Sequence, residues 1–387
     1  MPRWTLPQRK SVSDLPSLQW TENDATHTAA WRSAAGHAPP KRVVIADDTT
    51  PADTAWRLAC EGTALLWRGD FQNARQLLSA IARRIDRKPR KPPAGADAPT
   101  RFHLYRQAQA QRARTLGMLL VALDAQYALG LRRAPEVATA CTAAWGAQGG
   151  ACVVSLRELL GVVGAHQWRL KGVAVAALGA RIHPHYGVFS PVRGEYVELV
   201  ARAPLPADTA LAVDVGTGSG VLAAVLARRG VARVVATDVE PAALACARDN
   251  IDRLGLGGQI EVADCDLFAP LRAPLVVCNP PWLPGRPGTP LERAIYDPDS
   301  RMLRAFLDGL AAHLSPGGEG WLVLSDLAEH LGLRTRDALS GWIAAAGLRV
   351  LERLDTRPVH PRARDASDPL HAARAAEVTS LWRLAAA

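Results

Sequence analysis

The feature that most constrains the fold is a regular alternation of apolar and amphipathic segments that begins at residue 211. A short apolar run is followed by a glycine-rich turn and a helix-like segment, and similar strand and helix segments continue to the end of the chain. Strands that alternate with helices are typical of α/β proteins, in which helices cover both faces of a mostly parallel sheet. The sequence therefore predicts a doubly wound sheet with strands at 211–215, 233–237, 259–263, 275–278, 320–324, 349–354 and 378–384 and helices at 221–229, 241–254, 301–314 and 335–346.

The residues before this region have a different character, and we expect them to form separate parts of the protein. Residues 1–40 are polar, with scattered proline, serine and threonine, and are predicted to be poorly ordered. Residues 41–180 are predicted to form an auxiliary, mainly helical domain that recognises the substrate. The expected elements are short strands at 41–46 and 64–67, helices at 71–85, 103–129, 135–145 and 155–168, and a basic, proline-rich linker at 87–100.

The composition limits the classes of protein to which the chain can belong. Its 387 residues are 48% apolar and 21% charged, which suits about two to three folded domains and excludes disorder of the whole chain. No apolar run approaches the ~20 residues of a membrane helix, and no secretory signal is recognised, so a cytoplasmic protein without a membrane segment is expected. The six cysteines form no Cys-x-x-Cys pair and no cluster with zinc spacing, so no metal is expected.

The net charge of +9 is unevenly distributed along the chain. Residues 1–200 contain 26 Lys and Arg against 15 Asp and Glu, a balance of +11, whereas residues 201–387 contain 20 against 22, a balance of −2. A basic region of this kind can attract a polyanion such as RNA. Only five of the 46 basic residues are lysines, and a general bias toward arginine gives the same excess without such a ligand. Both interpretations stay open on charge alone.

The turn after the first strand of the alternating region, residues 214–220, reads Asp-Val-Gly-Thr-Gly-Ser-Gly. Such a turn between a strand and a helix lets a nucleotide-like cofactor approach the backbone. The dinucleotide fingerprint Gly-x-Gly-x-x-Gly is not met, because Val221 stands where its third glycine would be. S-adenosylmethionine has an ammonium group and no phosphate, so an acid beside the turn suits it. The predicted cofactor-binding residues in this turn are Asp214, Gly216, Thr217, Gly218 and Gly220.

Acidic residues also close the next two expected strands. Asp238 follows the second strand, where a carboxylate can accept hydrogen bonds from two ribose hydroxyls. Asp264 and Asp266 follow the third strand, where a carboxylate can accept a hydrogen bond from the adenine amino group. Because ligands in such sheets bind at the carboxyl ends of the strands, these acids and the glycine-rich turn are expected to form one site.

The fourth expected strand ends in the sequence Asn279-Pro280-Pro281-Trp282. The two prolines restrict the backbone, and the side-chain carbonyl of Asn279 with the backbone carbonyl of Pro280 can accept both hydrogens of a planar NH2 group. These hydrogen bonds would hold the nitrogen in line with a methyl group and favour its developing positive charge. Trp282 can stack on a flat acceptor. Asn279, Pro280, Pro281 and Trp282 are therefore the predicted catalytic residues, and Asn279 also borders the cofactor.

Residues 187–325 resemble the small-domain branch of the class I S-adenosylmethionine-dependent methyltransferases, which includes the release-factor glutamine and the rRNA guanine-N2 methyltransferases. The resemblance implies a Rossmann-like sheet of seven strands with a reversed hairpin at its end, within a domain that spans 181–387. It also implies that Asp238 binds ribose, that Asp266 faces adenine and that Asn279 orients the acceptor. Leu267 and Trp282 stand where some glutamine enzymes have tryptophan and tyrosine. The resemblance rests on the residues 187–195, 214–220, 238, 266–268, 279–282 and 314–318.

These observations favour an S-adenosylmethionine-dependent N-methyltransferase that acts on a planar amide or amino nitrogen. The acceptor stays open among a protein glutamine, which is slightly preferred, an RNA base and a small molecule. The expected partner is a protein or RNA, which can be associated with the ribosome. Other functions considered are non-catalytic binding of RNA or the ribosome, and nicotinamide-dependent oxidoreduction, which Val221 disfavours. The histidine-containing run 183–186 is interpreted as a loop leading into the fold, and the basic run 357–364 as a loop near the cleft.

Overall fold

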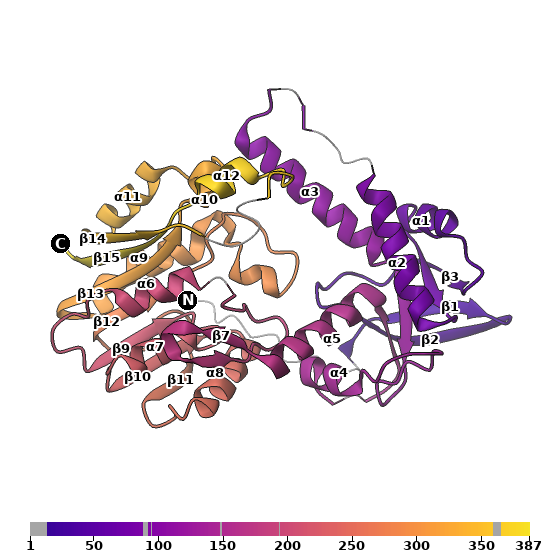
Figure 1. The fold of residues 1–387 in the computed structure, drawn as a ribbon, viewed down its shortest axis with the longest axis horizontal. Helices are drawn as coiled ribbons and strands as arrows, with labels where there is room; N and C mark the ends of the chain where they lie inside the picture. Colours follow the sequence, from indigo (N-terminus) through magenta and orange to yellow (C-terminus); the bar gives the residue numbers. More distant parts are fainter. Residues whose placement is uncertain (1–13, 88–91, 94, 148, 193, 359–364) are drawn as a thin grey trace. The chain divides into compact units, whose positions relative to one another are not determined.

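The computed structural model describes residues 14–87, 92–93, 95–147, 149–192, 194–358 and 365–387 (Figure 1). The chain divides into two compact units. The first contains the described residues up to Ala96 together with His103–Gln167, and the second contains Asp97–Phe102 and Trp168–Ala387. Within the described residues, no helix combines the length and the apolar character that crossing a membrane requires.

The second unit is built around a seven-stranded sheet with the order β11-β10-β9-β12-β13-β15-β14. Neighbouring strands from β11 to β13 run parallel, and β15 is antiparallel to both of its neighbours. The predicted doubly wound, mostly parallel sheet is therefore confirmed. Its strands are β9 (Leu211–Val215), β10 (Arg233–Asp238), β11 (Ile260–Asp264), β12 (Ala273–Cys278), β13 (Leu314–Ser325), β14 (Leu348–Thr356) and β15 (Thr379–Ala386).

Both faces of this sheet are covered, which explains why its central strands are apolar throughout. Along β12, Leu275 and Val277 belong to one buried cluster, which includes α6 (Glu195–Arg202), α7 (Val221–Arg228) and α8 (Pro241–Arg253). The alternate residues Val276 and Cys278 belong to the other cluster, which includes α9 (Arg301–His313) and α11 (Arg336–Ala345). A strand buried on both faces has no polar side to expose, so an apolar run is its sequence signature.

The remaining elements of the second unit are short. A two-stranded hairpin and a short helix precede the main sheet, and other short helices lie between β12 and β13, between β13 and β14, and between β14 and β15. They are β7 (Val173–Val175), η2 (Ala176–Leu178), β8 (Ala180–Ile182), η3 (Leu291–Ala294), η4 (Pro298–Ser300), α10 (Leu327–His330) and α12 (His371–Ala376).

The first unit contains a six-stranded sheet with the order β1-β2-β6-β5-β4-β3, so the helices expected in residues 41–180 accompany a sheet of which only the strands at 41–46 and 64–67 were predicted. Its strands are β1 (Ser17–Glu22), β2 (Ala25–Arg32), β3 (Arg42–Ala46), β4 (Thr63–Trp67), β5 (Leu119–Leu123) and β6 (Cys152–Ser155). Its helices are α1 (Ala52–Cys60), α2 (Phe71–Asp86), α3 (Ala98–Leu116), α4 (Ala138–Trp145) and α5 (Leu156–Lys171), of which α3 and α5 continue into the second unit.

The single helix expected over 103–129 is wrong, because α3 ends at Leu116 and β5 begins at Leu119. The run Leu119–Leu123 is buried between β4 and β6, and a short apolar run in a buried strand cannot be distinguished by its period from a buried helical turn. Of the linker expected at 87–100, residues 88–91 and 94 lie outside the described residues, and Ala98 onward belongs to α3.

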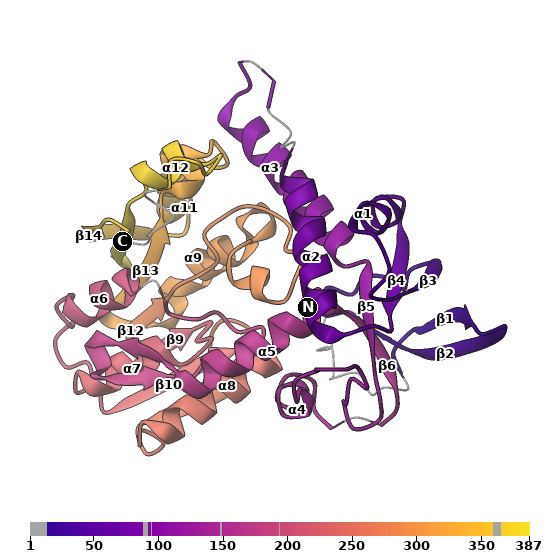
Figure 2. The ribbon, with the colours of Figure 1, turned by 45° about the vertical axis from the view of Figure 1, so that its right-hand side comes forward.

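The prediction that residues 1–40 are poorly ordered is wrong for the hairpin of β1 and β2, whereas residues 1–13 lie outside the described part (Figure 2). Glu22 pairs with Ala25 across a two-residue turn, in which Asn23 and Asp24 both adopt positive φ angles. Asparagine and aspartate tolerate this conformation, which two-residue hairpin turns require. The hairpin is mostly exposed, so its strands lack the apolar content that signals a strand in a core.

Candidate functional site

The glycine-rich turn connects the carboxyl end of β9 to the first residue of α7. Gly216, Gly218 and Gly220 all have positive φ angles, between 57° and 80°. At Gly220 a Cβ atom would also lie 3.3 Å from the backbone Cα of Ala247 in α8, so a side chain there has neither the backbone conformation nor the space it needs. The turn is therefore held close to α8, as a tight strand-to-helix connection requires.

Asp214 stabilises this turn through hydrogen bonds of its side chain. Its side chain is buried, and its Oδ2 accepts hydrogen bonds from Thr217 Oγ1 at 2.6 Å and from the backbone N–H of Ala223 at 3.0 Å. Burial raises the pKa of Asp214 to about 6, although these two hydrogen bonds act in the opposite direction. The predicted role of Asp214 and Thr217 in cofactor binding stays a prediction, and the contacts in the structure connect both residues to the turn and to α7.

Replacing Asp214 with asparagine is expected to change the pH dependence of stability. Because the folded pKa of about 6 exceeds the ordinary aspartate value of 3.8, stability from this group is present at low pH and is lost as pH rises through about 6. That loss amounts to about 3 kcal/mol, since one pKa unit corresponds to about 1.4 kcal/mol. The asparagine side chain does not titrate and can still accept both hydrogen bonds through its carbonyl oxygen.

The measurement is urea denaturation of wild type and Asp214→Asn at pH 4 and pH 7. Relative to wild type, the free energy of unfolding of the variant should rise by about 2 to 3 kcal/mol between the two pH values. The buried carboxyl group of Asp238, whose pKa is also raised, titrates in both proteins, so only its electrostatic coupling to Asp214 enters this comparison. If the difference in free energy of unfolding between variant and wild type does not change with pH, the pKa of Asp214 is not raised by burial.

Asp238 lies at the carboxyl end of β10, next to the glycine-rich turn. Its carboxylate accepts hydrogen bonds from the backbone N–H groups of Gly218 and Glu240, both at 2.9 Å. The strand register pairs Asp238 with Asp264 of β11, so the acids closing the second and third strands are neighbours, as expected. Burial raises the pKa of Asp238, and the backbone N–H groups counteract this effect.

The segment after β11 returns toward the same strand end. The backbone N–H of Cys265 donates to the carbonyl of Asp238 at 3.1 Å, and Thr237 Oγ1 donates to the carbonyl of Leu267 at 2.6 Å. Leu267 has a φ angle of 61°, so a non-glycine residue is held here in the left-handed region. Asp266 is exposed and Leu267 is half-buried. The contact of Asp266 and Leu267 with adenine stays a prediction. The hydrogen bonds described above place the segment that contains both residues beside the end of β10, as expected.

The Asn-Pro-Pro-Trp sequence follows β12, the other neighbour of β9. The register pairs Cys278 of β12 with Val215 of β9, so Asn279 and Gly216 are the next residues on two adjacent parallel strands. The structure therefore brings the predicted catalytic segment and the glycine-rich turn to the same point of the sheet edge. Pro280 is buried, and Asn279, Pro281 and Trp282 are half-buried.

The side chain of Trp282 makes a contact that the sequence analysis missed. Its indole Nε1–H donates to Asn279 Oδ1 at 2.8 Å. Its ring packs against the buried clusters on both faces of the sheet. Stacking of Trp282 on an acceptor stays a prediction. The hydrogen bond shows that Trp282 also contacts Asn279, the residue predicted to bind the acceptor nitrogen.

Asp297 is another residue of this region that sequence reasoning missed. It is buried, and its carboxylate accepts hydrogen bonds from the backbone N–H groups of Met302 and Leu303 at the start of α9, both at 3.1 Å. Burial raises its pKa. The backbone of Asp297 also donates to the carbonyl of Leu283 at 2.9 Å, so it connects α9 to the residue after Trp282. The sequence Asp-Pro-Asp-Ser before a helix was the available signal, because aspartate commonly caps helices.

The run 183–186 packs against α8 and reaches the glycine-rich turn through Asn250. The buried Asn250 accepts from the backbone N–H of His183 at 2.7 Å and donates to the carbonyl of Ser219 at 3.0 Å. His185 Nε2 lies 3.0 Å from Asp249 Oδ2. In the described part of the chain, no group of three His, Cys, Asp or Glu side chains is placed to hold a metal ion.

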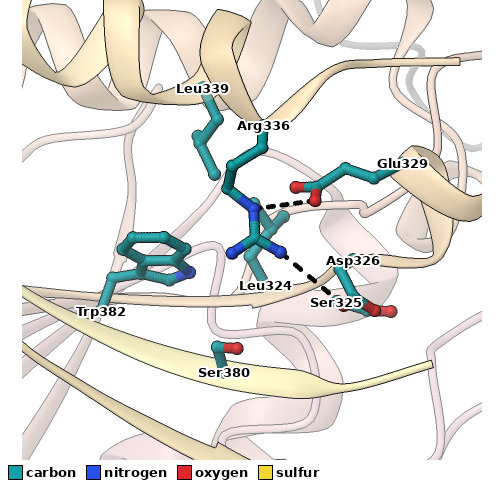
Figure 3. Close-up of a pocket in the computed structure, with 8 residues that line it drawn as sticks. All are labelled: Leu324, Ser325, Asp326, Glu329, Arg336, Leu339, Ser380 and Trp382. Carbon is teal, nitrogen blue, oxygen red and sulfur yellow. Dashed lines mark hydrogen bonds and ion pairs between the residues drawn. The ribbon is translucent and has the colours of Figure 1, made fainter. Parts of the chain in front are cut away.

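A small hollow lies near the carboxyl end of β13 (Figure 3). Arg336 occupies its centre, where its Nε donates to Glu329 at 2.8 Å and its Nη2 lies 3.7 Å from Asp326. The guanidinium also lies 5.7 Å from the ring centre of Trp382. The interior volume of about 10 Å³ is the size of one water molecule, so this hollow is too small for an acceptor group. The basic run 357–364 falls largely outside the described residues, which end at 358 and resume at 365.

Comparison with known proteins finds similarity to methyltransferases over the region that contains the site. Residues 179–336 match the methyltransferase small domain. A release factor glutamine methyltransferase from Cereibacter sphaeroides is 34% identical over 177 residues, which cover 41% of this chain and 61% of that protein. A ribosomal protein L11 methyltransferase from Pelotomaculum thermopropionicum is 38% identical over 142 residues, which cover 36% of this chain and 38% of that protein.

Among solved structures, a SAM-dependent methyltransferase from Thiobacillus denitrificans, in complex with S-adenosyl-L-homocysteine, has a TM-score of 0.35 and 18% identity. The match covers 51% of this chain and 92% of that chain. The chain spans about three fifths or less of the length of the two curated relatives named above. Residues 179–336, which match the methyltransferase small domain, include the glycine-rich turn, Asp238 and the Asn-Pro-Pro-Trp sequence.

Proposed function

We propose that this protein is an S-adenosylmethionine-dependent N-methyltransferase whose acceptor is a side-chain amide nitrogen of a protein. The observation that carries this proposal is the pairing of Cys278 with Val215, which sets Asn279 beside Gly216 at the edge of the sheet. A cofactor loop and an amide-recognising side chain on adjacent strand ends are the two parts that a methyl transfer to nitrogen needs.

The residues around the glycine-rich turn suit S-adenosylmethionine. A Cβ atom placed on Gly218 would meet no atom closer than 4.0 Å, so the turn is open on that side. Asp238 accepts from the N–H of Gly218, and its carboxylate oxygens can accept further hydrogen bonds, as ribose hydroxyls would supply. We propose that 216–220 and Asp238 hold the nucleoside and amino-acid portions, and that Asp266 and Leu267 border the adenine.

S-adenosylmethionine, when bound, supplies an electrophilic methyl group on a sulfonium centre. Asn279 accepts an N–H of the acceptor amide through Oδ1 and so holds the nitrogen lone pair toward the cofactor side of the sheet edge. Residues 216–220 and Asp238 would hold this cofactor, and its chemistry would be donation of the methyl group to that nitrogen, with the carbon–sulfur electrons kept by sulfur and one N–H proton released to water. The carbonyl oxygen of Asn279 stabilises the positive charge that develops on the nitrogen during this step.

The proteins with similar sequences favour a protein acceptor. They are named for methylation of a release factor glutamine and of ribosomal protein L11, both of which are proteins of translation. We infer that this chain also modifies a translation protein and that its first unit, a separate compact unit, recognises it. An RNA base amine is the second candidate, because residues 1–200 carry a balance of +11.

Transfer of a radiolabelled methyl group from S-adenosylmethionine into an extract of cells that lack this protein tests the proposal. Label that protease releases and ribonuclease does not would support the protein acceptor, and mass spectrometry of the labelled peptide should find one added methyl group on an amide side chain. Label that ribonuclease releases would favour the RNA base amine. Failure to label either class with a protein that binds the cofactor would contradict the proposed activity.

A further inference from the structure

The side-chain amide of Asn279 has two chemically different ends, and its orientation decides whether the site can work. The carbonyl oxygen accepts hydrogen bonds, whereas the NH2 group donates them. An acceptor nitrogen that carries hydrogens is held by the oxygen and repelled by the NH2 group. Rotation of the amide by 180° about its last bond exchanges the two ends with little change in shape, so something other than shape must select the orientation.

The indole of Trp282 provides that selection. An indole N–H donates a hydrogen bond and has no acceptor atom, so the atom of Asn279 that lies 2.8 Å from it must be the oxygen. In the rotated orientation two donors would face each other, and the half-buried indole N–H would lose this partner. The hydrogen bond therefore favours one orientation of the amide over the other.

The position of the indole is itself fixed. Pro280 and Pro281 separate the two partners and restrict the backbone between them. Half-buried Trp282 packs against buried residues on both faces of the sheet, which restricts movement of its ring. A carbonyl oxygen has two lone pairs, and the one that Trp282 leaves free can accept an N–H from the methyl acceptor.

We propose that Trp282 is a positioning residue, which holds the amide of Asn279 in the orientation that presents its oxygen to the methyl acceptor. This inference rests on the proposed function, because it assigns Trp282 a part in recognition of the acceptor nitrogen. The role differs from stacking, since it depends on the indole N–H and not on the face of the ring.

Replacing Trp282 with phenylalanine separates the two roles, because it keeps an aromatic ring and removes the N–H. The expected result is a decrease in kcat of about three- to tenfold, the usual value of one hydrogen bond, with the Kd for S-adenosylmethionine within about twofold of wild type. Trp342→Phe is the matched control. Trp342 is a half-buried tryptophan of α11 that packs against one of the same clusters, and its replacement should leave kcat unchanged.

The same substitution in an Asn279→Asp background tests whether Trp282 acts through the amide. A carboxylate presents an oxygen in both orientations, so it needs no orienting donor. Trp282→Phe should therefore change the kcat of the Asn279→Asp protein by less than about twofold. A loss as large as in the wild-type background would show that Trp282 acts by stacking or packing and would overturn the positioning role.

Hydrogen exchange of the indole N–H gives a readout that does not depend on activity. In 15N-labelled protein, the indole resonance that disappears in Trp282→Phe should exchange at least about tenfold faster in Asn279→Ala than in wild type, because its acceptor is gone. An exchange rate that Asn279→Ala leaves unchanged would overturn the inference. A protected indole in a wild-type protein that transfers no methyl group would instead contradict the proposed function alone.

Discussion

Replacing Asn279 with alanine is expected to lower kcat by about 10²- to 10³-fold, while the affinity for S-adenosylmethionine stays within about twofold of the wild-type value. The oxygen of Asn279 stabilises charge that develops on the acceptor nitrogen, so its removal raises the energy of the transition state more than that of the bound complex. Steady-state methyl transfer measures kcat, and isothermal titration calorimetry measures cofactor affinity.

Gln259→Ala is the matched control for this experiment. Gln259 also has an amide side chain, but it is exposed and precedes β11 at the opposite, amino edge of the sheet. Its replacement should leave kcat and cofactor affinity unchanged. Wild-type turnover in Asn279→Ala would falsify the assigned role of the amide, and an equal loss of cofactor binding would show that Asn279 acts mainly on the cofactor.

Replacing Asp238 with alanine is expected to weaken the binding of S-adenosylmethionine by about 100-fold. A carboxylate that accepts from two ribose hydroxyls forms two charge-assisted hydrogen bonds, each worth about 1.5 to 3 kcal/mol, and desolvation reduces their sum. The variant also loses the bond from the backbone N–H of Gly218, which holds the glycine-rich turn against β10. Both effects act on cofactor binding, so kcat at saturating cofactor should change much less than Kd.

Titration calorimetry with S-adenosylmethionine and with S-adenosylhomocysteine measures this effect. Asp308→Ala, which removes an exposed carboxylate from α9, is the control and should bind both ligands as wild type does. Asp238→Asn keeps acceptor oxygen and loses charge, so its affinity should lie between those of wild type and Asp238→Ala. Unchanged affinity in a folded Asp238→Ala protein would exclude Asp238 from the cofactor site.

The two halves of the chain differed in how well their sequences predicted the structure. In the second unit each expected strand and helix of the main sheet is present, with ends that differ by a few residues, apart from β13, which begins six residues earlier than expected. In the first unit only the strands at 41–46 and 64–67 were predicted, and the other four strands of the sheet were missed. Its middle depends on the parallel pairing of β2 with β6, in which Ala30 lies beside Cys152. A local sequence pattern cannot predict the pairing of two strands that lie more than 100 residues apart in the chain.

The sequence by itself determined the doubly wound sheet and the order of the loops along its edge. The spacing of apolar residues, the glycine-rich turn and the paired prolines are local properties of the chain, so they can be recognised without the tertiary structure. Tertiary structure decided how the side chains at that edge are used. It directs the carboxylate of Asp214 into the turn, where burial raises its pKa, and it joins Asn250 to the carbonyl of Ser219. It also joins Trp282 to Asn279. These outcomes depend on burial and on hydrogen-bond geometry, which arise only when distant segments of the chain pack together.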